Sequence, residues 1–265
     1  MIDRGTGTPI VLMPGIQGRW EWLAPTVDAL AERCRVITFS LCDEPSSGFS
    51  CDPSLGVENY FKQLEQAFDR AGLREAVLVG TSYTGPIAAE FAARHPDRVR
   101  ALVLVSALPP DWRPNARARF YLRAPVLLSP IFALDSPTRM LPELRAALPG
   151  FASVVRFATA QTARVMRAFM SPRRMAARLR WTEEFQYSDV SSVAQPVLVI
   201  TGEDGLDRVV DPALTRRYLA ALPAAQHVVL SRTGHIGMLT KPAEFADIIF
   251  RFANETSHHA RRVSA

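Results

Sequence analysis

The stretch AVLVGTSYTGPIAAEFAA, residues 76–93, decides the fold of this chain. Its first four residues are apolar and predict a buried strand, whereas its last eight favour a helix. Gly80 and Gly85 flank Ser82 between these elements, so the chain turns sharply from strand to helix with a serine at the corner. A serine held in this way exposes its hydroxyl above a helix N-terminus. The stretch therefore predicts an α/β fold and makes Ser82 a candidate nucleophile.

The same alternation of strand and helix continues along the chain. Apolar runs predict strands near 10–13, 35–40, 76–80, 99–106, 197–201 and 227–230. Helical periodicity between these runs, as in residues 57–71, predicts helices with one apolar face. This order favours a mostly parallel central sheet with helices on both faces, and such sheets bind ligands at the carboxyl ends of their strands.

Residues 107–187 differ in character from the rest of the chain. Prolines interrupt helical stretches in this segment, for example at Pro137 and Pro142. The segment is predicted to form a helical cap that is inserted over the strand ends. Residues 1–106 and 188–256 are predicted to form the core that carries the sheet.

Positive charge is concentrated in the predicted cap. Residues 111–181 hold 13 arginines and three acidic residues, a net charge of +10 in a chain whose total is +5. Long-range attraction of anionic substrates is one interpretation. Solvated helix faces are the plainer one, because arginine outnumbers lysine 29 to 2 in the whole chain. No nucleic-acid-binding motif accompanies the charge, so a nucleic-acid partner is not expected.

A serine hydroxyl becomes a nucleophile when a base removes its proton, so the five histidines are the next candidates. His258 and His259 lie in a polar tail and His95 ends a predicted helix, which favours solvated side chains. His227 opens an apolar strand, where a structural role is the simpler interpretation. His235 has glycine on both sides, one and two residues away, in a loop after the last predicted strand. His235 is therefore the predicted catalytic base.

A carboxylate is needed to orient the histidine, and four acids crowd the loop that follows the strand predicted at 197–201. Asp211 precedes a proline and a helix, which predicts an N-cap. Asp207 is the predicted catalytic acid because it lies at the crest of the loop. Asp204 in the same loop is the first alternative, and Asp111, which follows a different strand, is the second.

With Ser82, Asp207 and His235 in this order, the chain resembles the α/β-hydrolase fold superfamily, in its serine-nucleophile branch with a helical cap. The resemblance covers residues 5–254, and the helix and strand at 91–105 are also similar to those that follow the nucleophile in this family. It implies a catalytic triad and acyl transfer to a serine. No cofactor and no metal are implied.

The resemblance also implies an oxyanion hole built from two backbone N–H groups. One belongs to the residue after the nucleophile, Tyr83. The other belongs to the loop after the first core strand, PGIQG at 14–18, where Ile16 is the expected donor and Gln17 the alternative. The candidate substrate-binding residues are Gln17, Trp20 and Trp22. Ordinary packing is the alternative explanation for the two tryptophans.

The chain departs from the family pattern at three places. Thr84 stands where the G-x-S-x-G motif has its second glycine, and Pro14 stands where the family usually has the histidine of His-Gly. Only nine residues precede Ile10, so the antiparallel hairpin that commonly begins these proteins is expected to be missing. The edge of the sheet would then be exposed or covered by another subunit.

The remaining sequence features bound the cellular setting. Cys34, Cys42 and Cys51 are too few and too clustered for a disulfide framework, so reduced thiols are expected. No secretory leader and no apolar run of membrane length is recognised, which favours a cytoplasmic protein without a membrane partner, as a monomer or a homodimer. Residues 257–265 are predicted to form a disordered tail.

These observations predict an enzyme that hydrolyses a small-molecule carboxylic ester through an acyl-enzyme on Ser82. Hydrolysis of a carbon–carbon bond next to a ketone, acyl transfer and perhydrolysis use the same residues and stay as alternatives. A further alternative is a receptor-like binding protein with a weakened triad, for which Thr84 and Pro14 would be the marks.

Overall fold

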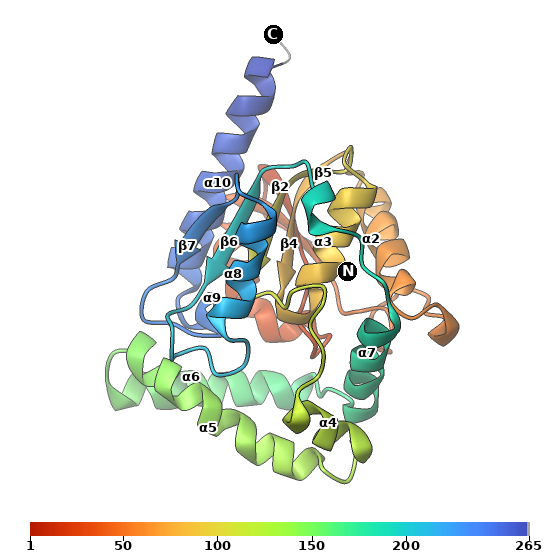
Figure 1. Ribbon diagram of the computed structural model, residues 1–265. Coiled ribbons are helices and arrows are strands. Elements are labelled where there is room, and N and C mark those ends of the chain that lie inside the picture. Colours follow the sequence, from red (N-terminus) through yellow and green to blue (C-terminus); the bar gives the residue numbers. More distant parts are fainter. Residues whose placement is uncertain (264–265) are drawn as a thin grey trace.

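The computed structural model describes residues 1–263, with side chains through 256, and shows a seven-stranded sheet with helices on both faces (Figure 1). The strand order is β1-β3-β2-β4-β5-β6-β7, and β1 alone runs antiparallel to its neighbour. The strands are β1 (Ile2–Arg4), β2 (Thr8–Leu12), β3 (Cys34–Thr38), β4 (Ala76–Thr81), β5 (Val99–Val105), β6 (Val197–Thr201) and β7 (Gln226–Val229). The six strands predicted from apolar runs are confirmed.

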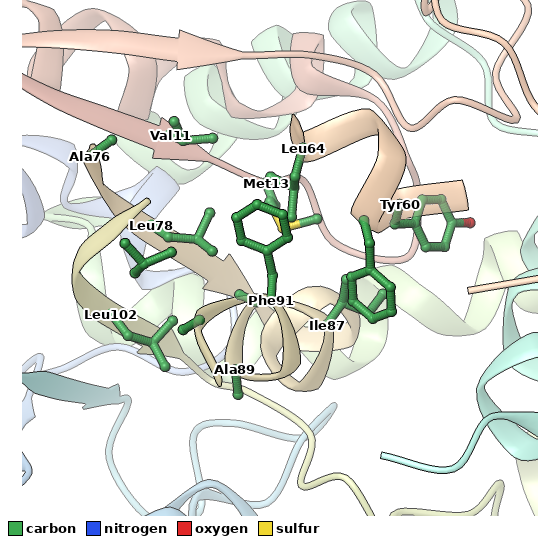
Figure 2. Packing of buried hydrophobic residues seen from close by; sticks show 14 of the residues in the cluster. Val11, Met13, Tyr60, Leu64, Ala76, Leu78, Ile87, Ala89, Phe91 and Leu102 are labelled. Atoms are coloured by element: carbon green, nitrogen blue, oxygen red, sulfur yellow. The ribbon is translucent and has the colours of Figure 1, made fainter. Parts of the chain in front are cut away.

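Side chains that alternate along the strands build two separate cores. Ile10 of β2 packs in the core beneath α1 and α10, and its neighbour Val11 packs in the core beneath α2, α3 and α8. Figure 2 shows Phe91 of α3 directed toward Met13 and Leu64 in the second core. Burial on both faces explains why the central strands are apolar at successive positions. The covering helices are α1 (Ala24–Ala31), α2 (Glu58–Arg70), α3 (Gly85–Arg94), α8 (Pro212–Ala221) and α10 (Pro242–Val263).

The N-terminal segment forms an edge strand, β1, that the apolar runs did not predict. β1 and β2 do not form a hairpin with each other, but β1 pairs antiparallel with β3 from Ile2↔Thr38 to Arg4↔Val36. β1 and β2 thus form no hairpin, as expected, and the edge of the sheet on this side is the three-residue strand β1. Coverage of that edge by another subunit stays a prediction. The chain turns between β1 and β2 at Gly5 and Gly7, which both adopt positive φ. Gly5 also lies so close to β3 that an added Cβ atom would be 2.2 Å from the Cys34 carbonyl oxygen.

Four helices are inserted between β5 and β6 and lie together at one end of the sheet (Figure 1). They are α4 (Ala116–Arg123), α5 (Ser129–Ala147), α6 (Gly150–Arg167) and α7 (Pro172–Glu184). Pro137 and Pro142 do not interrupt a helix as predicted but lie inside α5. A proline removes one backbone hydrogen bond without necessarily ending a helix. Next to Pro137, which lacks an N–H donor, the Ser136 hydroxyl donates to the Phe132 carbonyl. The domain limits at 107 and 187 stay a prediction.

Short helices connect the larger elements, and the last helix is longer than expected. The short helices are η1 (Trp20–Leu23), η2 (Pro53–Leu55), η3 (Ser82–Thr84), η4 (Val190–Ser192) and α9 (Gly237–Thr240). α10 continues to Val263 through most of the tail predicted as disordered at 257–265, since extending an existing helix costs little. Residues 264–265 lie outside the described residues. Among residues 1–263, no helix combines the length and apolarity needed to cross a membrane.

Candidate active site

Ser82 lies at the corner between β4 and η3, with a backbone φ of 52°. This left-handed conformation is uncommon for a serine and marks local strain. Two glycines make the corner possible. A Cβ on Gly80 would lie 2.6 Å from the Ala88 Cβ, and a Cβ on Gly85 would lie 2.4 Å from the Ala107 Cβ. The close approaches therefore fall at residues 80 and 85, and the glycine one residue later than the usual motif is the one that the packing requires.

Thr84 is fully buried and forms part of the corner. Its hydroxyl accepts a hydrogen bond from the Thr81 N–H at 3.0 Å and donates to the Thr81 carbonyl at 3.1 Å. The Thr81 side chain accepts from the Thr84 N–H in return, which completes a capping box. The hydroxyl of Thr81 also donates to the Met13 carbonyl at 2.9 Å. Threonine at position 84 thus fastens the turn, and it does not obstruct it.

His235 and Asp207 are brought together by the loops after β7 and β6. His235 Nδ1 lies 3.1 Å from Asp207 Oδ2. The other oxygen, Asp207 Oδ1, accepts the N–H groups of Val209 and Val210 at 2.9 and 2.8 Å. The side chains of Asp207 and His235 are 1% and 11% exposed. A buried carboxylate with both oxygens engaged is suited to hold the imidazole in one orientation and one tautomer.

Close backbone packing keeps the two loops in contact. A Cβ on Gly234 would lie 2.5 Å from the Leu206 carbonyl oxygen, and a Cβ on Gly202 would lie 2.6 Å from the Gly234 Cα. The Glu203 N–H donates to the Thr233 carbonyl at 2.8 Å. Glycine beside His235 therefore serves close approach of the two loops, which brings the imidazole to the carboxylate.

The charge environment favours an ion pair between the two side chains. Burial acts to raise the pKa of Asp207, but His235 and the two N–H donors outweigh it and hold this pKa below its usual value. Burial acts to lower the pKa of His235, but the Asp207 charge and hydrogen bond outweigh it and raise this pKa above its usual value. The imidazole is thus a stronger base than a free histidine.

The other acids considered from sequence lie elsewhere. Asp204 pairs with Arg216 at 2.8 Å and is 71% exposed, and Asp111 pairs with Arg217 at 2.5 Å and is 62% exposed. Asp211 caps α8 as predicted, since its side chain accepts from the Ala213 N–H. Neither alternative approaches the imidazole in the way that Asp207 does.

His227 has a structural partner, as expected. Its Nε2 lies 3.0 Å from the Thr201 hydroxyl.

The loop expected to supply an oxyanion donor closes as a tight turn. The Gly18 N–H donates to the Gly15 carbonyl at 2.9 Å, and Gly18 has a φ of 71°. In a planar trans peptide the N–H points opposite to the carbonyl, so this bond directs the Ile16 N–H to the other side of the turn. The corner that carries Ser82 lies next to this loop, because a Cβ atom added to Gly15 would be 3.8 Å from the Ser82 Cβ.

Tyr83 occupies the first turn of η3, where backbone N–H groups lack partners within the helix. Among the side chains that the structure describes, no hydrogen bond joins Ser82 Oγ to His235.

Arg178, on the inserted helix α7, was not singled out from the sequence and is the largest fully buried side chain. Its Nη1 donates to the Ile16 carbonyl at 2.7 Å, and its own carbonyl accepts the Tyr83 hydroxyl at 3.0 Å. Its Nε donates to Asp43 at 2.9 Å and its Nη2 to Glu44 at 2.5 Å. Burial acts to lower the pKa of Arg178, but the two acids outweigh burial, so this pKa lies above its usual value. One arginine thus ties the inserted helices to both expected oxyanion residues.

The three expected substrate-binding residues lie in different surroundings. A Cβ atom added to Gly15 would lie 3.0 Å from the Gln17 side-chain oxygen and 3.8 Å from the Ser82 Cβ, so the Gln17 amide lies on the side of Gly15 that faces Ser82. Trp22 instead donates its indole N–H to the Ala168 carbonyl at 3.0 Å and so joins η1 to the inserted helices. The Arg4 guanidinium lies 6.0 Å from the Trp20 ring centre. The alternative interpretation of packing therefore fits the two tryptophans, and Gln17 stays a candidate for substrate contact.

A surface hollow of about 350 Å³ lies away from these residues, between residues 109–113, residues 185–190 and α8. Its lining includes Asp111, Tyr187 and Arg217 but none of the three expected catalytic residues. The hollow is therefore separate from the candidate catalytic residues.

Comparison with known proteins agrees with this architecture. A model of the alpha/beta hydrolase family matches residues 10–248. The protein named "Putative carbamate hydrolase RutD" from Caulobacter sp. (strain K31) is 28% identical over 94% of this chain and 91% of its own length. The 2-hydroxy-6-oxo-2,4-heptadienoate hydrolase of Pseudomonas putida is 27% identical over 88% of this chain and 84% of its own length.

A solved structure shows the same fold at lower identity. The enol-lactonase from Burkholderia xenovorans LB400 superimposes with a TM-score of 0.74 and 20% identity, over 96% of this chain and 95% of that one. The family model alone covers most of the chain, from the first parallel strand to the last helix. The chain belongs to the alpha/beta hydrolase family.

Proposed function

We propose that this protein is a serine hydrolase of small-molecule carboxylic esters. The observation that carries the proposal is the strained Ser82 at the end of β4, together with the buried His235–Asp207 pair at the ends of β7 and β6. Family membership and the hydrolase names of the relatives support hydrolytic chemistry. The choice of an ester rests on the serine and its expected base.

In the proposed mechanism, His235 removes the proton of the Ser82 hydroxyl as the oxygen attacks the acyl carbon. The imidazolium, held by Asp207, then gives that proton to the leaving alkoxide. Water, deprotonated by His235, then attacks the acyl carbon, and the imidazolium returns the proton to the departing Ser82 oxygen as the acid is released. The Ile16 and Tyr83 N–H groups stabilise the oxyanion in both steps, a contribution of about 3 kcal/mol for a donor of this kind.

Intact-mass measurement after treatment with a fluorophosphonate tests the proposal. The wild type should gain one adduct, and Ser82→Ala should gain none while its melting temperature stays close to that of the wild type. A folded wild type that takes up no adduct contradicts an activated serine and favours the binding-protein alternative.

A carbon–carbon bond hydrolase is a second candidate, because two relatives carry such substrates in their names, 2-hydroxy-6-oxo-2,4-heptadienoate hydrolase and 2-hydroxymuconate semialdehyde hydrolase. Parallel assays with p-nitrophenyl esters and with a vinylogous diketone separate the two. Turnover of the diketone at a much higher kcat/KM than any ester would replace the ester proposal.

A further inference from the structure

Glu143, on the inserted helix α5, lies against the backbone of the loop that carries His235. The residue is 1% exposed. Its two carboxylate oxygens share the Ile236 N–H, each at 3.1 Å, and the Gly234 N–H also faces the carboxylate and acts to lower its pKa. These N–H groups belong to the residues on either side of His235. An acid from the inserted helices therefore holds the chain on both sides of the imidazole.

A second contact of α5 reaches the loop that carries the catalytic acid. Arg139 donates to the carbonyl of Arg208, the residue directly after Asp207. Residues four apart share one face of a helix, so Arg139 and Glu143 present neighbouring side chains from the same face of α5. One turn of α5 thus contacts the loops of both members of the His235–Asp207 pair.

We propose that Glu143 is a positioning residue for His235, which it orients through the two flanking residues and whose positive charge it stabilises. The inference rests on the proposed hydrolase function for its catalytic meaning. Because Glu143 belongs to α5, the base is correctly oriented only while α5 is docked on the histidine loop.

The titration of Glu143 connects this contact to pH. Burial raises the pKa of Glu143 to about 7, although the two N–H donors and His235 act to lower it. The ionisable groups that face the imidazole are Asp207 from the acid loop and Glu143 and Arg139 from α5; the two acids raise the pKa of His235 and Arg139 lowers it. Ionised Glu143 therefore strengthens His235 as a base above neutral pH.

The test follows the imidazole of His235 by NMR in the full chain, with His235→Asn to assign its resonance. Fluorophosphonate labelling rates of the same proteins are measured against pH. Glu143→Gln keeps the size and one acceptor oxygen but removes the charge, whereas Glu143→Ala removes both. Glu184→Ala, which removes an exposed carboxylate on α7, is the matched control.

Glu143→Gln is expected to lower the pKa of His235 by about 1 and to move the acid limb of the labelling profile to lower pH by the same amount. Glu143→Ala is expected to label about 10- to 100-fold more slowly, the scale of a small misplacement of a catalytic group. Glu184→Ala should match the wild type in both measurements.

An unmoved imidazole titration in Glu143→Gln overturns the proposal, and so does a wild-type labelling rate in a folded Glu143→Ala. If Glu143→Ala does not fold, the titration of Glu143→Gln decides. If the wild type is not labelled but its imidazole titration shifts on substitution as expected, the hydrolase proposal fails while the positioning of His235 stands.

Discussion

At the scale of single residues, Asp207 is distinguished from its neighbours by its hydrogen bonds. One of its carboxylate oxygens faces His235, and the other accepts hydrogen bonds from two backbone N–H groups. The exposed Asp204 has an arginine partner and no contact of this kind. Sequence placed both residues in one loop, but the turn that closes from Glu203 to Leu206 decides which of them points toward the imidazole.

Asp207→Asn should reduce fluorophosphonate labelling strongly, by up to about 10⁴-fold, because the amide favours the wrong imidazole tautomer. Asp204→Asn and Asp111→Asn are matched controls and should label at the wild-type rate. Equal rates in all three variants would show that Asp207 does not act as the catalytic acid.

The raised pKa of His235 gives opposite pH dependences for reactivity and stability. Labelling needs the neutral imidazole, so its rate should rise with pH through a pKa above the usual 6.5. The protonated imidazole stabilises the folded state, a contribution that is complete below pH 6.5 and is lost as pH rises through the folded pKa. Labelling rates and urea unfolding between pH 5 and 9 test this, with His235→Asn as the control. A labelling limb below pH 6.5 would contradict it.

At the scale of elements, the corner between β4 and α3 shows how the sequence pattern and the packing differ. The pattern of alternating strands and helices predicted the corner and its serine correctly. The G-x-S-x-G motif of the family instead made Thr84 a departure and a mark of a weakened triad, because sequence spacing alone does not show which backbone atoms come close. The structure places the close approaches at Gly80 and Gly85 and gives the Thr84 hydroxyl two hydrogen bonds.

Substitution of Thr84 should therefore weaken the fold even when it restores the usual motif. Thr84→Ala is expected to lose about 1 kcal/mol of unfolding free energy with the capping hydroxyl. Thr84→Gly should lose roughly a further 0.4–1 kcal/mol, because glycine adds freedom to the unfolded chain. Urea denaturation measures both. A Thr84→Gly variant as stable as the wild type would mean that the capping box contributes nothing.

At the scale of the whole molecule, the inserted helices are joined to the sheet domain by buried charge. Arg178 of α7 bonds Asp43 and Glu44, whose other oxygen lies 3.3 Å from Arg174 and 3.7 Å from Arg19. The sequence did not reveal this contact, because Arg178 is one of 13 arginines in its segment and its acidic partners lie more than 130 residues away. Local pattern predicts elements, whereas long-range ion pairs depend on how those elements dock.

Arg178→Ala should destabilise the protein by about 3–5 kcal/mol, because it leaves Asp43 and Glu44 buried without their partner. Labelling of Ser82 should also slow, since the Ile16 carbonyl loses its hydrogen bond. Arg180→Ala, an exposed arginine on the same helix, is the control and should change stability by less than about 1 kcal/mol. Equal unfolding curves for the two variants would contradict the anchoring role.

The inserted helices are attached unequally, and this affects how the protein can diversify. α7 is fixed by Arg178, and α5 buries Glu143 and Leu144 near its end, whereas α4 buries none of its residues. Substitutions in α4 can therefore accumulate without disturbing the residues around Ser82 or His235. Sequence change is therefore expected to concentrate in α4, since its residues contribute neither buried contacts nor the buried ion pairs of Arg178.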